Sequence, residues 1–85
     1  MKIHLLYFAG LREALGQAGE SLDLPAGVAS IGELRSHLAS RGGAYATQFA
    51  AGRNLRAALN QDMAPATAAI SEGDEVAFFP PVTGG

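Results

Sequence analysis

The residues of this sequence best suited to chemistry are the last two, Gly84 and Gly85. A terminal α-carboxylate becomes reactive when an ATP-dependent partner converts it to an acyl adenylate, because the acyl group can then pass to sulfur or nitrogen. Neither glycine carries a Cβ, so a narrow channel in another protein can close around the bare backbone. Pro80 and Pro81 come just before and favour an extended exit. The sequence therefore predicts an extended C-terminal tail over residues 82–85.

The other side chains offer little chemistry. The two histidines, His4 and His37, lack the third ligand and the spacing that a metal site needs. No serine stands in a G-x-S-x-G setting, and the glycine pair Gly42-Gly43 forms no phosphate-binding pattern. The sequence has no cysteine, which excludes disulfides, iron–sulfur clusters and thiol nucleophiles. We therefore expect a chain that binds no metal or cofactor and is catalytically inert alone.

Length and charge limit the class of protein. Eighty-five residues correspond to one small domain. The net charge is only −2 with six basic residues, which argues against nucleic acid or an anionic membrane as the main partner. No apolar run approaches the roughly 20 residues of a membrane span, and the apolar N-terminal stretch lacks a cleavage site. We expect a soluble, cytoplasmic protein.

Hydrophobic periodicity and turn residues divide the chain into strands and helices. Ser30 and Glu33 form a capping-box pattern that starts the main helix, which Gly42-Gly43 should end. The first strand carries apolar residues on both faces, as a strand in the middle of a sheet does. The expected elements are a strand over 3–8, a short helix over 11–15, a strand over 20–24, the main helix from 31, a short helix around 45–49, a strand over 55–59, a weak return arm over 63–69, and a last strand over 75–79.

These elements suggest one architecture. The first and last strands are the most apolar, so both should lie centrally in a mixed sheet of four to five strands, with the main helix on one face. This is an α+β roll of the β-grasp, or ubiquitin-like, kind. It would occupy residues 1–81 as a single domain and leave residues 82–85 as the tail.

Three segments of the sequence carry a resemblance to a known family. Residues 73–85, GDEVAFFPPVTGG, resemble the C-terminal signature of the small subunit of molybdopterin synthase, the MoaD family. Leu6-Tyr7-Phe8-Ala9 followed by Leu11-Arg12-Glu13, and the turn Leu59-Asn60-Gln61, are similar to that family as well. The likeness spans essentially the whole chain, whereas residues 42–52 and 64–69 have no distinctive match.

The resemblance implies a sulfur carrier. In this family an adenylyltransferase uses ATP and magnesium to adenylate the terminal glycine, here Gly85, and a sulfur donor converts it to a thiocarboxylate. The tail, threaded into the large synthase subunit, then delivers sulfur to cyclic pyranopterin monophosphate to build the dithiolene of molybdopterin. Gly84 would fit the channel. Partner contacts would come from five residues: Phe79, Pro80, Pro81, Val82 and Thr83. The large subunit, in a heterotetramer, and the activating enzyme are the implied partners.

Three other functions are compatible with the pattern. The sulfur carrier of thiamine synthesis is also a β-grasp protein ending in Gly-Gly, but such chains are usually shorter and lack the Phe-Phe-Pro-Pro-Val-Thr lead-in. A ubiquitin-like modifier would join Gly85 to lysines of target proteins and appear in high-mass conjugates. A plain binding module would keep its function after deletion of the tail.

Overall fold

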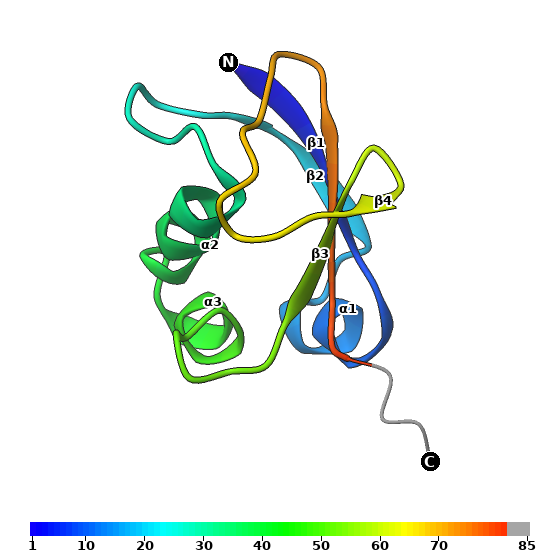
Figure 1. Cartoon of the computed structure of the whole chain (residues 1–85). Coiled ribbons are helices and arrows are strands. Elements are labelled where there is room, and N and C mark those ends of the chain that lie inside the picture. Colours follow the sequence, from blue (N-terminus) through cyan, green and yellow to red (C-terminus); the bar gives the residue numbers. More distant parts are fainter. Residues whose placement is uncertain (82–85) are drawn as a thin grey trace.

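The chain folds into one twisted sheet with helices packed on one side of it. A computed structural model describes residues 1–81, and Figure 1 shows their arrangement. The elements in chain order are β1 (Lys2–Tyr7), α1 (Ala9–Leu15), β2 (Gly19–Asp23), α2 (Ile31–Ala39), α3 (Gly43–Gln48), β3 (Arg56–Leu59), β4 (Asp62–Met63) and β5 (Glu75–Phe79).

The first and last strands form the centre of the sheet. The strand order is β2-β1-β5-β3-β4, with β1 and β5 parallel and the other neighbouring pairs antiparallel. This confirms the expected β-grasp roll, a mixed sheet with one main helix and two short ones. The expected return arm is reduced to the two residues of β4 at the sheet edge and a single bridge between Ser30 and Ala69.

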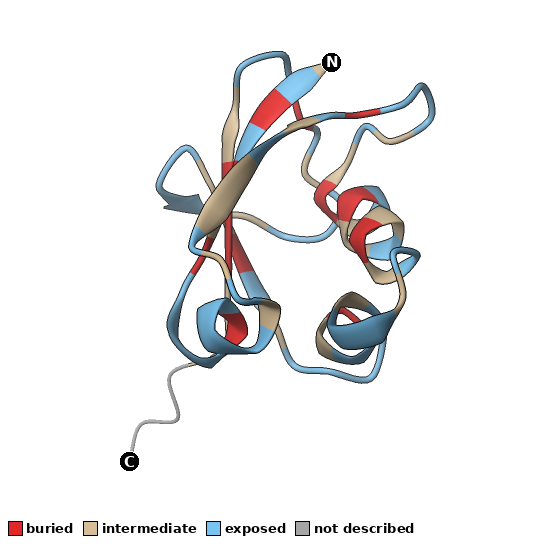
Figure 2. Cartoon of the chain, turned by 180° about the vertical axis from the view of Figure 1, so that it is seen from behind, coloured by how far each residue is buried: buried red, intermediate tan, exposed pale blue. Residues whose placement is uncertain are grey.

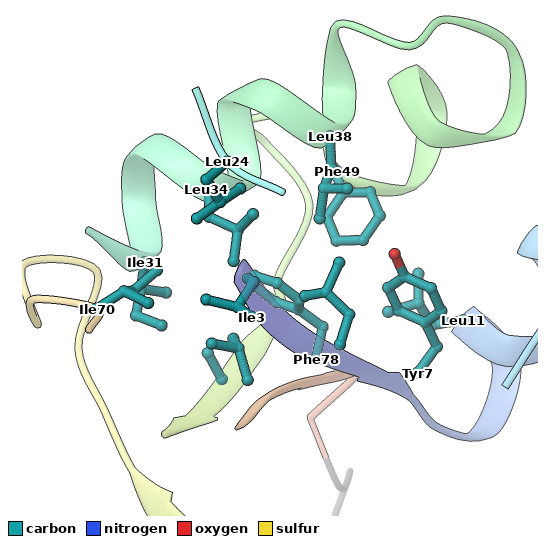
Figure 3. Close-up of a cluster of buried hydrophobic side chains, with 13 residues drawn as sticks. Ile3, Tyr7, Leu11, Leu24, Ile31, Leu34, Leu38, Phe49, Ile70 and Phe78 are labelled. Atoms are coloured by element: carbon teal, nitrogen blue, oxygen red, sulfur yellow. The ribbon is translucent and has the colours of Figure 1, made fainter. Parts of the chain in front are cut away.

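A single hydrophobic core lies between the sheet and the helices (Figure 2). From α2, the buried side chains recur at helical spacing at Ile31, Leu34 and Leu38. From β1, alternate residues point inward, among them Ile3 and Leu5. Figure 3 shows these side chains meeting Phe49 and Phe78 in one cluster.

The main helix begins where the capping pattern predicts. The Ser30 hydroxyl accepts a hydrogen bond from the Glu33 backbone N–H at 3.2 Å. The Glu33 carboxylate accepts from the N–H of Ala29 at 3.0 Å, one residue before the one expected in a capping box. The carbonyls of Ala68 and Ala66 accept from the first two helical N–H groups, of Ile31 and Gly32. The start of α2 is therefore fully capped by the chain itself.

Two expectations need correction. Helix α2 ends at Ala39, before the glycine pair that was expected to end it; Gly42 and Gly43, with φ of 80° and 55°, make the left-handed link into α3. The first strand is central, as predicted, but only one of its faces lies under helices. On the other face His4 is exposed and Leu6 is half-buried. An apolar residue on an uncovered face raises the question of what contacts it.

Candidate functional site

Strand β5 is the element that leads into the predicted tail. It is hydrogen-bonded on both sides, with Phe78 in register with Tyr7 of β1 and with Ala57 of β3. Phe79 is the last residue of the strand, and the half-buried Pro80 and Pro81 follow it. Proline has no backbone N–H to donate, so the ladder cannot continue through them. Val82, Thr83, Gly84 and Gly85, the remaining predicted site residues, lie outside the described residues.

The two phenylalanines that end β5 have different environments. Phe78 is 1% exposed, and its ring meets the Phe49 ring edge-on at a centroid distance of 5.2 Å (Figure 3). Phe49 in turn contacts Tyr7 edge-on and stacks on Tyr45. Phe79 is only half-buried and, because neighbouring strand residues alternate, points to the other side of the sheet. Of the two rings, Phe78 anchors the strand and Phe79 is the one available to a partner.

Phe79 belongs to an apolar surface on the side of the sheet that no described helix covers, here called the helix-free face. Ala77 is in register with Leu6 on β1 and with Ala58 on β3, and Ala58 is in register with Met63 on β4. Residues in register on neighbouring strands point to the same side. Met63 is 60% exposed, and Phe8, which follows β1 directly, is 45% exposed.

Sequence reasoning named Phe79 for this surface but missed Phe8 and Met63. For Phe8 a signal existed. In a strand with Leu5 and Tyr7 pointing inward, period two sends Leu6 outward, and the apolar run continues through Phe8 beside the last strand. For Met63 the sequence pattern predicted only a weak return arm after the turn, whereas the structure pairs Met63 with Ala58 of β3. Large exposed apolar side chains gathered on one face are typical of a protein-binding surface.

A polar network supports the end of β1 from the helix side. The Glu20 carboxylate accepts hydrogen bonds from the Tyr7 hydroxyl at 2.8 Å and from Gln17 at 3.0 Å. It also accepts two from the Arg41 guanidinium, at 2.8 and 2.9 Å. The Arg41 guanidinium lies 4.8 Å from the centroid of the Tyr45 ring, within cation–π range. The network ties edge strand β2 to the α2–α3 link.

Ionisation in this network is shifted to favour the ion pair. The Arg41 hydrogen bonds hold the pKa of Glu20 below its usual range, against the opposing effect of burial. Burial, with the hydrogen bond to Glu20, raises the pKa of Tyr7 well above its ordinary value. The carboxylate is therefore charged and the phenol neutral at neutral pH. The arrangement has the features of a structural tie, because its groups bond one another.

A second polar lock lies at the opposite end of β5. The left-handed residues Asn60 and Gln61, with φ of 50° and 72°, form the β3–β4 turn that their sequence predicted. The Asn60 amide donates to Asp74 at 3.0 Å, and the Asn60 side-chain oxygen accepts from the N–H of Glu75 at the same distance. The Asn60 hydrogen bond and that of the Ser71 N–H lower the pKa of Asp74. Strand β5 is thus held at its start as well as at its end.

A groove of about 530 Å³ opens between α2 and the β3–β4 hairpin. Its charged lining residue on α2, Arg35, donates to the carbonyls of Phe49, Ala50 and Arg53. These carbonyls lie just after α3, so the guanidinium caps the end of that helix. The groove therefore holds a structural arginine that is already occupied.

Two further kinds of feature, a metal-binding cluster and a membrane-spanning helix, are absent from the described part of the chain. Residues 1–81 hold no group of three or more His, Asp or Glu side chains placed to bind a metal ion. Over the same residues, no helix is both long and apolar enough to cross a bilayer. The site is therefore a strand end with an exposed apolar face beside it.

Comparisons with known proteins agree with this geometry. A family model described as the ThiS family matches residues 5–85. The molybdopterin synthase sulfur carrier subunit of Haemophilus influenzae is 40% identical over 98% of this chain and 99% of its own length. The subunit of the same name from Escherichia coli is 39% identical over the same shares.

Two solved structures share the fold. The small archaeal modifier protein 1 of Haloferax volcanii is 26% identical with a TM-score of 0.77, over 95% of this chain and 98% of that one. A complex of subunits 1 and 2 of the molybdopterin-converting factor from Helicobacter pylori matches with 20% identity and a TM-score of 0.66 over the full length of both chains. Sequence and structure together show that this chain belongs to the ThiS family of ubiquitin-like β-grasp proteins, as a relative of the molybdopterin synthase sulfur carrier subunits.

Proposed function

We propose that this chain carries sulfur as a thiocarboxylate on Gly85 and donates it to cyclic pyranopterin monophosphate, forming the dithiolene of molybdopterin. The observation that carries the proposal is the conjunction of a doubly hydrogen-bonded strand, β5, with the segment Pro80-Pro81-Val82-Thr83-Gly84-Gly85 directly after it. The full-length relation to sulfur carrier subunits supports it.

The chemistry needs two activating steps that this chain does not perform. In the first, a carboxylate oxygen of Gly85 attacks the α-phosphorus of ATP in the magnesium-dependent active site of an adenylyltransferase, and pyrophosphate leaves. In the second, a hydrosulfide-class nucleophile attacks the acyl carbon and AMP leaves, which gives the thiocarboxylate. The chain itself supplies the acyl group and holds it in reach. ATP and magnesium belong to the partner and bind elsewhere.

The contribution of the fold is positioning. The four residues after Pro81 span at most about 14 Å, so the reacting group works within that distance of Pro81. Because β5 pairs with both β1 and β3, the end of the strand that leads toward the tail is fixed in the sheet. Positioning of this kind matters because a misplacement of about 1 Å can cost a hundredfold in rate.

Partner binding is assigned to the helix-free face around Phe79. The activating enzyme and the large synthase subunit must both receive the same tail, so both need the surface beside its first residue. The apolar side chains there, Phe8, Met63 and Phe79, fit a protein partner that covers them. Because both partners use the same surface, the activating enzyme and the large subunit must compete for it.

The test is deletion of Gly85, which shortens the reach by up to about 3.6 Å and leaves the folded part untouched. We expect thiocarboxylate formation and molybdopterin formation to fall at least a hundredfold, with an unchanged melting temperature. The matched control is Gly52→Ala, a change at an exposed glycine of the folded part where an added Cβ meets nothing within 4 Å. Intact mass spectrometry of the parent should show sulfur in place of one oxygen. If the deletion supports molybdopterin formation at the parent's rate, the proposal is wrong.

A second candidate function is protein modification, which the similarity to the archaeal modifier protein favours. Both functions begin with the same acyl adenylate, and they differ in whether sulfur or a lysine amine attacks it. Purification from native cells distinguishes them. Isopeptide conjugates of high mass that contain Gly85 would support modification.

A further inference from the structure

The small net charge of this protein conceals a separation of charge along the direction of β5. Figure 1 shows the N-terminus and the turn before β5 at one end of the molecule, and α1 with the end of β5 at the other. The two ends are here called the far pole and the tail pole. Strand register assigns charged residues on the sheet to one pole or the other, because β1 and β5 run toward the tail pole and β3 runs away from it.

The tail pole carries an excess of basic side chains. Arg56 is exposed and in register with Phe79, so it stands beside the last residue of β5 on the helix-free face. Arg53 lies in the loop that leads into β3, held by a hydrogen bond to Gln48. Arg12 lies one helical turn after Phe8, whose N–H bonds to the carbonyl of Phe78. One acidic side chain, Glu13 on α1, lies among these arginines.

The far pole is acidic. Glu72 and Asp74 lie in the turn before β5, and Glu75 is its first residue. Asp62 is in register with Leu59, at the end of β3 away from the tail, and Asp23 is in register with Lys2. Five of the eight acidic side chains of the protein therefore lie at the end opposite Phe79, against two cationic groups there, Lys2 and the N-terminal ammonium, which pairs with Asp23.

The distance along the tail decides what the arginines can contact. Gly85 is six residues beyond Phe79, which is roughly 20 Å for an extended chain threaded into a partner. An arginine beside Phe79 is therefore out of reach of the reacting carboxylate and of any nucleotide or pterin bound to it. It is in reach of the surface around the opening that receives the tail.

We propose that Arg56, with Arg12 and Arg53, forms a basic collar that steers the tail into the large synthase subunit, whose opening carries complementary carboxylates. This inference rests on the proposed function and names the chemistry of its partner surface. Separated charge orients a protein as it approaches its partner, and such steering raises association rates by about tenfold or more. The acidic far pole works in the same direction, since it is repelled by the carboxylates that attract the collar.

Lys2 provides a matched control for Arg56. Both are exposed basic residues on the helix-free face, at opposite poles. The ion pairs formed within residues 1–81 are Met1–Asp23 and Arg41–Glu20, and neither involves these two side chains. Arg56→Gln and Lys2→Gln change the net charge equally. They differ in the pole at which the charge is lost.

The experiment measures the association rate constant with the large subunit by stopped flow, at about 0.1 M and about 1 M salt, between which the Debye length falls from about 10 Å to about 3 Å. At the lower salt we expect Arg56→Gln to reduce the rate about threefold and Arg12→Gln with Arg56→Gln about tenfold, whereas Lys2→Gln stays within about 1.5-fold of the parent. At the higher salt all four proteins should associate at similar rates. Sulfur transfer in the assembled complex should be unchanged, because the collar does not touch the reacting group.

Three results would overturn the inference. The collar is refuted if Arg56→Gln and Lys2→Gln associate at equal rates, or if the association rate of the parent does not depend on salt. In either case the proposed function stands as long as the parent protein supports molybdopterin formation. A parent that neither binds the large subunit nor supports molybdopterin formation refutes both.

Discussion

Comparing Phe79→Ala with Phe78→Ala separates binding from folding, because the two neighbouring phenylalanines lie on opposite sides of the sheet. Phe79 is half-buried on the helix-free face, so its removal takes away part of the proposed binding surface and leaves the core closed. We expect a loss of about 2 kcal/mol in binding to each partner, or about a 30-fold rise in Kd. The free energy of unfolding should fall by no more than about 1 kcal/mol.

Phe78→Ala is the control, and its magnitude follows from the core. Phe78 is 1% exposed and contacts Phe49 edge-on, so truncation leaves a cavity that the sheet cannot close. Such changes cost about 3–5 kcal/mol. In a domain of this size each kcal/mol shifts the melting temperature by about 4–8 °C, which predicts a fall of at least about 12 °C.

The assay pairs thermal unfolding with titration calorimetry against the activating enzyme and the large subunit. The reasoning requires opposite outcomes for the two variants: weak binding by a stable Phe79→Ala, and a large drop in stability for Phe78→Ala. If Phe79→Ala keeps its fold and binds both partners with unchanged affinity, the helix-free face is not the partner-binding surface. Equal destabilisation by the two variants refutes the assignment of the two rings to opposite sides.

Three further predictions concern the support of the site. Glu20→Gln should cost about 2 kcal/mol at neutral pH, because the carboxylate loses its charged bonds to Arg41. Since the folded-state pKa of Glu20 is depressed, the advantage of the parent is present above the ordinary glutamate pKa and disappears as pH falls through the folded value; urea unfolding from pH 7 to 3 measures it, and a pH-independent difference contradicts it. Gly19→Ala should lower the melting temperature strongly, because a Cβ there overlaps the carbonyl oxygen of Leu5, whereas Gly52→Ala should leave the melting temperature unchanged. Equal melting temperatures of the two variants in calorimetry would contradict the close approach of β1 and β2 at Gly19. The purified chain alone should show no turnover of the pterin precursor, and turnover without a partner contradicts a carrier role.

Much of the fold could be predicted because its signals are local. The alternation of Leu5 and Tyr7, the Ser30–Glu33 cap and the Asn60-Gln61 turn each depend on residues within one element or one turn. Placing the first and last strands centrally needed only their apolar content. The tail motif was visible for the same reason, since it is a continuous segment.

The rest could not be predicted because it depends on residues brought together by the fold. Glu20 lies 21 residues from Arg41 and 13 from Tyr7, and nothing in either neighbourhood marks them as partners. The outward position of Met63 follows from a register two strands away. The charge separation likewise depends on the fold, because each pole collects charged residues from segments that lie far apart in the sequence.

The parallel pairing of β1 with β5 has a consequence for the life of the protein in the cell. Residues 4–7 find their partners at 75–78, so the centre of the sheet joins segments about 70 positions apart. Because synthesis proceeds from the N-terminus, the ribosome makes β5 after every other described strand, and β1 has no parallel neighbour until then. Contacts this distant in sequence form late and slowly. Under the proposed function, an activating enzyme that binds around Phe79 would meet its surface only once the last strand has been inserted, and ATP would not be spent on nascent or half-folded chains.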